Sequence, residues 1–298
     1  CNLVNVHRYI RIRPVGKYQF RRHLKPVMIF FAMSCATTIY TNLDTVMLGF
    51  IKTDIDVGYY NAAVKIKGVL LGIVTSLGTV LLPRASYYIE HHEMEEFRRI
   101  TKKAINFVFL IAVPLTCYFI LYAKEGILFL SGNEYMSAVL PMQIIMPTII
   151  FIGLTNIMGI QMLVPMGCEK IVLYSEIAGA VVDLILNTLL IPQLSSVGAA
   201  IGTLVAEGVV WIVQFAALRK EVTPAYRNVH YGKVVLSTVV GMVSSGWVKT
   251  LGMGNFATLL VSAILFFSGY AIVLTVLKEP LVWEIKNQVF TKVKGMIK

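Results

Sequence analysis

Residues 43–66 read LDTVMLGFIKTDIDVGYYNAAVKI and place two charged side chains, Asp44 and Lys65, inside two successive apolar segments. A short polar turn separates these segments. At about 1.5 Å of helical rise per residue, each charge lies roughly 10 Å from the turn, so the two should lie at similar depth. If the segments span a bilayer, an unpaired charge at that depth costs about 3 kcal/mol or more. Asp44 and Lys65 therefore either neutralise each other or belong to a functional site.

Composition places the chain among integral membrane proteins. Hydrophobic residues make up 57% of the sequence and charged residues only 14%, whereas about a quarter of a typical soluble domain is charged. A helix needs about 20 apolar residues to cross the hydrocarbon core. The sequence therefore predicts an all-α membrane fold with eight transmembrane helices, at roughly 26–50, 58–83, 104–123, 137–161, 171–191, 197–219, 232–250 and 255–277.

The basic residues set the expected orientation in the membrane. Of the 27 Lys and Arg residues, 22 fall in segments on one side of the predicted spans, whereas the other side holds only Lys52, Lys124 and Lys249. Segments rich in Lys and Arg stay in the cytoplasm, so we expect both ends of the chain there. This distribution accounts for the net charge of +11 without a nucleic-acid partner. The basic segments are 1–25, 84–103, 162–170, 219–233 and 278–298.

No pattern in the sequence points to an enzyme, a disulfide or a metal site. The four cysteines are scattered and form no CxxC pair. Nucleophile motifs, phosphate-binding loops, dinucleotide fingerprints and metalloprotease helices are all missing from the sequence. We therefore expect no catalytic residue, no metal and no cofactor. The first 25 residues hold neither a signal peptide nor an apolar run, so we interpret the chain as a portion of a longer protein.

The second predicted span carries a polar stripe. Polar or small residues recur there at steps of three and four, which places them on one face of a helix. Lys65 lies on this face, whereas Lys67 lies about 200° around the helix from it. We therefore expect Lys65, with Asn61, to contact the substrate. The stripe consists of Asn61, Lys65, Gly68, Gly72, Ser76 and Thr79.

Acidic groups mark the fifth and sixth predicted spans. Glu176, Asp183 and Asn187 stand at positions i, i+7 and i+11, which share one helix face. Glu207 and Gln214 stand seven residues apart on the next span. Buried carboxylates pair with a base, bind a cation or exchange protons. Together with the charges on the first two spans, they form either interhelical contacts that hold the bundle together or a hydrated cavity with a cation site and an anion-binding lysine.

Two stretches of the sequence resemble a known family. The first combines Leu43–Gly49 with Val57–Ile66, and the second is residues 187–207, NTLLIPQLSSVGAAIGTLVAE. They look like the Wzx-type polysaccharide flippases of the multidrug/oligosaccharidyl-lipid/polysaccharide exporter superfamily. The Asn-x-x-Leu-Ile-Pro and Gly-Ala-Ala elements of the second stretch are the specific part of this resemblance, and the rest is supporting hydropathy.

The resemblance implies an architecture. Proteins of this superfamily have two six-helix lobes, often followed by two extra helices. The chain would then hold the second lobe and the extra pair, as the C-terminal portion of a protein whose N-terminal six-helix lobe is a partner outside this sequence. We therefore expect a basic cytoplasmic connection at 1–25, a six-helix lobe at 26–219, and two additional helices with a basic tail at 220–298.

The resemblance also implies a function. Wzx-type proteins are thought to flip undecaprenyl-diphosphate-linked oligosaccharides to the outer leaflet of the inner (plasma) membrane, for surface polysaccharides such as lipopolysaccharide. A diphosphate needs positive charge in a low-dielectric passage, which assigns Lys65 and Asn61 to substrate binding. Expected partners are the lipid-linked oligosaccharide, membrane lipids and a polysaccharide polymerase complex.

Alternating access in this superfamily is coupled to a cation gradient, and the ion expected here is H⁺ or Na⁺. In related drug exporters, acids on the first helix of the second lobe help to bind the ion. This implies cation coupling or charge balance for the acidic and amide residues on the predicted spans, namely Asp44, Asp183, Glu176, Asn187 and Glu207.

Two other functions are compatible with the same sequence. A cation-coupled multidrug or metabolite exporter of the same superfamily shares the fold, and fold alone does not decide function. A membrane-embedded glycan polymerase needs a sizeable outer loop for its catalytic groups, but the longest outer connection, 124–136, has only about 13 residues. The flippase is therefore the function that we expect.

Overall fold

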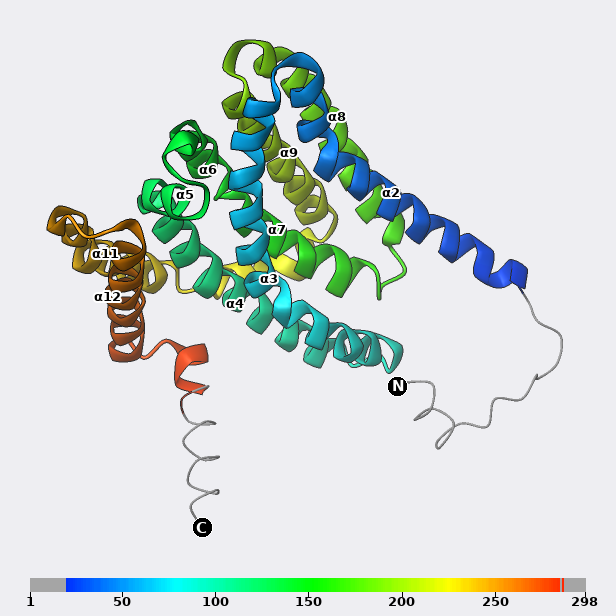
Figure 1. Cartoon of the computed structure of the whole chain (residues 1–298). Helices are drawn as coiled ribbons and strands as arrows, with labels where there is room; N and C mark the ends of the chain where they lie inside the picture. Colours follow the sequence, from blue (N-terminus) through cyan, green and yellow to red (C-terminus); the bar gives the residue numbers. More distant parts are fainter. Residues whose placement is uncertain (1–19, 285, 287–298) are drawn as a thin grey trace, which may run out of the picture.

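The computed structural model describes residues 20–284 and 286, and it shows a bundle of helices with an appended helical hairpin (Figure 1). The predicted connection at 1–25 and the basic tail lie largely outside these residues. The elements are α2 (Phe20–Ile51), α3 (Asp54–Glu90), α4 (Met94–Leu121), α5 (Ala123–Ser131), η1 (Asn133–Ala138), α6 (Val139–Ile145), α7 (Thr148–Thr155), η2 (Asn156–Leu163), α8 (Glu169–Leu194), α9 (Ser196–Ala217), α10 (Arg219–Arg227), α11 (Tyr231–Gly246), η3 (Trp247–Leu251) and α12 (Asn255–Val276).

In the described part of the chain, six helical segments are long and apolar enough to cross a membrane: α3, α4, α8, α9, α11 with η3, and α12. The bent pair Asn133–Ile145 and Thr148–Leu163 would make a seventh. The predicted first span, 26–50, is helical as part of α2, but α2 is not among the six. The all-helical membrane fold is therefore confirmed, whereas the count of eight spans and the two-lobe arrangement stay predictions.

Two predicted connections are more helical than expected. Helix α3 continues to Glu90 and α4 begins at Met94, so the stretch 84–103 is formed by two helix ends with a short turn between them. The connection at 124–136 consists mostly of α5 and η1. In both places the helices extend beyond the apolar runs. Polar residues such as Glu, Lys and Arg favour the helix, so a drop in hydropathy does not mark a helix end.

The α2–α3 and α8–α9 turns are tied together at one end of the bundle (Figure 1). Thr53 caps α3, and its side chain and that of Asp56 each bond the other's backbone N–H in a capping box. Lys52 Nζ donates to the Pro192 carbonyl at 2.8 Å. Ser195 Oγ donates to Asp56 Oδ1 at 2.5 Å. These contacts hold the two helical hairpins in register.

The predicted span at 137–161 is broken. Helix α6 ends at Ile145 and α7 begins at Thr148, and the two parts are bent by 45°. Pro147 lies in the break, where its missing N–H and its ring interrupt a helix. The π-helix η2 then follows α7 directly. Pro114, by contrast, lies within the uninterrupted α4.

The hairpin of α11 and α12 docks on α4 through tyrosine hydroxyl groups. Tyr118 donates to the Leu259 carbonyl at 2.8 Å and Tyr122 to the Ser245 carbonyl at 2.7 Å. In the other direction, Tyr270 of α12 donates to the Leu110 carbonyl at 2.8 Å. Tyrosine suits such a place because its ring packs in apolar surroundings while its hydroxyl satisfies a backbone group.

The two helices α8 and α9 pack closely because small residues line their contact. A Cβ atom added at Gly198 would lie 2.6 Å from the carbonyl carbon and oxygen of Leu190. Backbone atoms at that distance cannot move aside as a side chain could. Gly198 and Gly202, four positions apart, therefore allow the two helices to approach, as small-residue spacings do in other membrane proteins.

Replacing Gly198 by alanine is expected to destabilise the protein by about 1–3 kcal/mol, because the new methyl group overpacks the α8–α9 contact. Thermal unfolding of the purified protein in detergent measures this. The matched control is Gly208→Ala in the same helix, where the added Cβ meets nothing within 4 Å and alanine raises helix propensity. Equal melting temperatures for the two variants would contradict the packing argument.

Candidate functional site

A polar cavity of about 470 Å³ lies within the bundle, between α2, α3, α8, α9 and the broken span. Most of the protein around it is apolar, so its polar lining is distinctive. Helix α2 contributes three hydroxyl-bearing side chains, α3 a lysine, and α8 and α9 acidic and amide groups. The residues that define its chemistry are Thr37, Tyr40, Lys67, Glu176, Glu207 and Gln214.

A buried hydrogen-bond network lies deeper between the same four helices. The Asp44 side chain on α2 is only 2% exposed. Its Oδ1 accepts a hydrogen bond from Asn187 Nδ2 of α8 at 2.6 Å. Its Oδ2 accepts one from the Tyr60 hydroxyl of α3 and lies 2.9 Å from Thr203 Oγ1 of α9. One carboxylate thus binds three donors from three other helices.

Asp183 brings a second carboxylate to this network. Asn187 Nδ2 bridges the two acids, because it also lies 3.1 Å from Asp183 Oδ2. Asp183 and Asn187 are both fully buried, and Asp183 Oδ1 and Asn187 Oδ1 accept no hydrogen bond from the residues that the structure describes. Two adjacent carboxylates in a dry site repel each other unless a positive charge accompanies them. The arrangement therefore brings two carboxylates and two oxygen atoms without a hydrogen-bond partner into one buried network.

Lys67, and not Lys65, faces these acids. Lys67 is half-buried in the cavity wall, and the acids that act on its ammonium group are Glu207 first, then Asp44 and Asp183. Lys65 is exposed on the surface of the chain, beside Gly68 and Gly72. Within the described residues, Asp44 makes no ion pair with Lys65, so of the two alternatives for these charges the structure does not show mutual neutralisation.

The remaining predicted site residues are spread over the cavity and its surroundings. Glu207 is 7% exposed and lines the cavity, as does the half-buried Glu176, whose Oε2 accepts from Thr37 Oγ1 at 2.5 Å. Gln214 donates to Ser175 Oγ at 3.0 Å. Asn61 accepts from Thr45 Oγ1 at 3.3 Å and is not part of the cavity lining. Glu176 and Asp183 therefore lie at different heights along α8, Glu176 at the cavity and Asp183 in the buried network.

Sequence reasoning missed Lys67, Tyr40, Tyr60 and Thr203. Tyr40 lies four residues before Asp44, and Thr203 lies four residues before Glu207, so helical spacing from the chosen acids could have found both. Tyr60 carried no such signal, because only the α2–α3 packing places it against Asp44. Lys67 was not chosen because the polar stripe lies on the neighbouring face of α3, which carries Lys65.

Comparisons with known proteins agree on the class of membrane protein. Residues 1–140 match the family model described as a polysaccharide biosynthesis protein. An uncharacterised membrane protein of Methanocaldococcus jannaschii is 26% identical over 77% of this chain and 45% of its own length. A putative O-antigen transporter of Escherichia coli K12 is 28% identical over 64% of this chain and 46% of its own length.

A solved structure of the lipid II flippase MurJ, in an inward closed conformation, superposes with a TM-score of 0.72 at 14% sequence identity. The superposition covers 94% of this chain and 59% of MurJ. The resemblance to Wzx-type polysaccharide flippases is confirmed. The chain spans about half the length of the curated relatives that it matches.

The family match and the buried network overlap only in part. The matched residues 1–140 include Asp44, Lys65 and Lys67. Asp183 and Glu207 lie beyond that match, so the structure alone brings them to the same place as Asp44. The site is therefore assembled from both halves of the chain.

Replacing Thr203 by valine is expected to lower the free energy of unfolding by about 1.5–3 kcal/mol, because it removes a hydroxyl group from a buried carboxylate. Valine has nearly the same shape as threonine. Thr188→Val on α8 is the matched control, because the exposed Thr188 hydroxyl contacts only the Leu184 carbonyl of its own helix, at 2.7 Å. Thermal unfolding in detergent compares the two. A Thr203→Val variant as stable as the control would show that the network contributes little to stability.

Proposed function

We propose that this chain is the C-terminal portion of a flippase that moves undecaprenyl-diphosphate-linked oligosaccharides from the cytoplasmic to the outer leaflet by alternating access. The main support for this proposal is the cavity within the bundle, which has Lys67 on its wall. The similarity to a putative O-antigen transporter and the fold shared with a lipid II flippase support it. The protein then acts in the inner (plasma) membrane for surface polysaccharide synthesis.

Two lysines of α3 are available for the anionic part of the substrate. Lys67 lines the cavity, and Lys65 lies exposed on the adjoining face of the same helix. In a two-lobe transporter, an exposed face of one lobe borders the passage between the lobes. A diphosphate moving through this passage needs positive charge in place of water. We infer that Lys67 holds the diphosphate beside the cavity and that Lys65, with Asn61, contacts the substrate at the lobe surface.

We infer that the buried network of Asp44, Asp183, Asn187 and Thr203 binds the coupling cation, H⁺ or Na⁺. The free oxygen atoms Asp183 Oδ1 and Asn187 Oδ1 fit this role, because both are buried and accept no hydrogen bond within the described residues. Carboxylate, amide and hydroxyl oxygens are suitable donors for a hard cation. The cation supplies the positive charge that two adjacent buried carboxylates require, and Glu176 and Glu207 balance the charge of Lys67.

The architecture proposed for the whole protein follows the superfamily. Helix α2 would be the first span and would complete the predicted count of eight. Residues 26–219 would form the second lobe and residues 220–298 the additional helix pair, with both chain ends in the cytoplasm. The N-terminal lobe would complete the passage. The lipid-linked oligosaccharide and a polysaccharide polymerase complex are the partners that the proposed function requires.

The acidic lining of the cavity favours a second candidate, a cation-coupled exporter of cationic compounds. Glu176 and Glu207 outnumber Lys67 there, and the Tyr40 ring offers a surface for a cationic ligand. Drug tolerance of cells that express the protein separates the two functions. An exporter raises tolerance to cationic drugs, whereas a flippase restores surface glycan.

In cells that depend on this protein for surface glycan, Lys67→Ala is expected to reduce the glycan about 10-fold or more. Losing a charged hydrogen-bonding group costs about 1.5–3 kcal/mol, which corresponds to roughly 10- to 100-fold. Lys67→Arg keeps the charge and should retain most of the export. Lys65→Ala is expected to reduce export less than Lys67→Ala. The control is Lys124→Ala, which alters an exposed lysine on α5. Normal export by Lys67→Ala would contradict the proposed role of Lys67 in binding the diphosphate.

Coupling predicts that Asp44→Asn and Asp183→Asn lose gradient-driven export. Glycan appearance at the surface is followed after the proton or the sodium gradient is collapsed with a selective ionophore. Wild-type export should fall with one of the two gradients, whereas both variants should be low from the start and insensitive, because each loses a negative charge that the cation requires. Asp54→Asn, at an exposed position that begins α3, is the control and should behave as wild type. Variants that keep normal, gradient-sensitive export would contradict the coupling site.

A further inference from the structure

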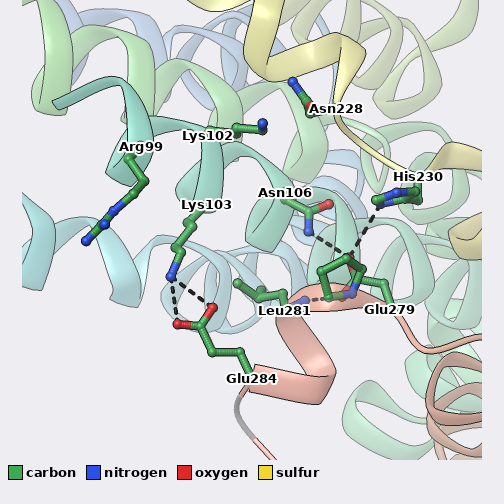
Figure 2. A pocket seen from close by; sticks show the side chains of 10 residues that line it. Arg99, Lys102, Lys103, Asn106, Asn228, His230, Glu279, Leu281 and Glu284 are labelled. Atoms are coloured by element: carbon green, nitrogen blue, oxygen red, sulfur yellow. Dashed lines mark hydrogen bonds and ion pairs between the residues drawn. The ribbon is translucent and has the colours of Figure 1, made fainter. Parts of the chain in front are cut away.

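A second pocket, of about 350 Å³, lies between the start of α4, the α10–α11 connection and the segment after α12 (Figure 2). Its lining shares no residue with the polar cavity inside the bundle. It lies at the end of the bundle that the charge distribution predicts to be cytoplasmic. Residues that give it its character are Arg99, Lys102, Lys103, His230, Glu279 and Glu284.

The acids of this pocket are already engaged. Glu279 is 1% exposed, and its Oε2 accepts from the backbone N–H groups of Leu281 and Val282 at 2.8 and 3.0 Å. Its Oε1 accepts from Asn106 Nδ2 at 2.9 Å, and Glu284 pairs with Lys103 at 2.7 Å (Figure 2). Arg99 also pairs with Glu96 at 3.0 Å, so Lys102 is the lysine or arginine of this pocket that makes no ion pair within the described residues.

Four exposed cations around the pocket form what we call the basic rim: Lys102, Arg219, Lys220 and Arg227. Within the described residues, none of the four makes an ion pair with an acid. Asn228 lies on both the pocket and the adjacent depression formed by α10, so the rim is continuous. Helix α10 buries Val222 and Ala225 against the bundle and exposes its charges. A short amphipathic helix between two spans is suited to the membrane surface.

An apolar groove of about 410 Å³ continues from the pocket along the outside of the bundle. It runs between α4 and α12, and Leu281 lines both the groove and the pocket. Phe107, Leu110, Tyr270 and Leu274 form its walls. A phospholipid has a charged headgroup and apolar acyl chains. The pocket with its lysines suits the headgroup, and the apolar groove that continues from it suits an acyl chain.

We propose that this two-part site binds an anionic phospholipid of the leaflet that it faces. The phosphate lies at Lys102 and the basic rim, and one acyl chain lies along the groove between α4 and α12. Basic pockets between spans at the cytoplasmic side are suited to anionic headgroups. The lipid would connect α4, α10 and the α11–α12 hairpin, in addition to their direct contacts such as that of Lys103 with Glu284.

Native mass spectrometry of the purified full-length protein tests the headgroup. Phosphatidylglycerol and phosphatidylcholine with the same acyl chains are added separately. Retention of phosphatidylglycerol should exceed that of phosphatidylcholine about fivefold or more, since each nearby cation favours an anionic lipid. Lys102→Ala should remove most of this preference and Lys102→Arg should keep it. Lys124→Ala, which alters an exposed lysine far from the pocket, should leave the preference unchanged. Equal retention of the two lipids by the wild-type protein would overturn the proposal.

The groove has its own test. Ala271 lines the groove and is exposed, so Ala271→Trp fills the groove from its outer edge. This variant should lose phosphatidylglycerol while its melting temperature in detergent stays within a few degrees of wild type. Millimolar inorganic phosphate should not displace the lipid, because it lacks an acyl chain. Displacement by inorganic phosphate, unchanged binding to Ala271→Trp, or stronger retention of undecaprenyl phosphate than of phosphatidylglycerol would each contradict a phospholipid site.

Discussion

The Asp44 carboxylate is the point at which four helices of this bundle meet. A charged group with 2% exposure is stable in an apolar bundle only if protein groups replace its water. Tyr60, Asn187 and Thr203 do so from three different helices. The close packing at Gly198 and Gly202 brings α9 near enough to α8 for this. The position of Asp44 therefore fixes how α2, α3, α8 and α9 lie around one another.

The same constraint links the buried network to the cavity. Helices α2, α3, α8 and α9 contribute both to the network and to the cavity wall. Lys67 shares the cavity wall with Glu207, and Asp44 and Asp183 are the next acids around it. A positive charge that enters or leaves the network therefore changes the electrostatic balance at the lysine. This is the physical basis on which we propose that cation binding and substrate binding influence each other.

Hydropathy and helical spacing predicted most of the fold and part of the site. Long apolar runs identified the membrane helices, and the i, i+4 spacing of Asp183 and Asn187 anticipated their contact. Pro147 marks a place where a kink is expected, but the angle of the break and the π-helix after it could not be read from an apolar run, because hydropathy does not record a bend. The choice between Lys65 and Lys67 depended on how α3 is rotated about its axis. That rotation is set by the Tyr60–Asp44 contact, which is a property of packing.

Thermal unfolding under cation titration tests whether the network around Asp44 holds a cation. A cation that binds only the folded protein stabilises it, by roughly 2.7 kcal/mol at 100 times its dissociation constant. Na⁺ at constant ionic strength, or H⁺ over a mild acid range, should raise the melting temperature of the wild-type protein and have little effect on Asp44→Asn. No response to either cation in the wild type, or an equal response in Asp44→Asn, would show that the Asp44 network does not bind a cation.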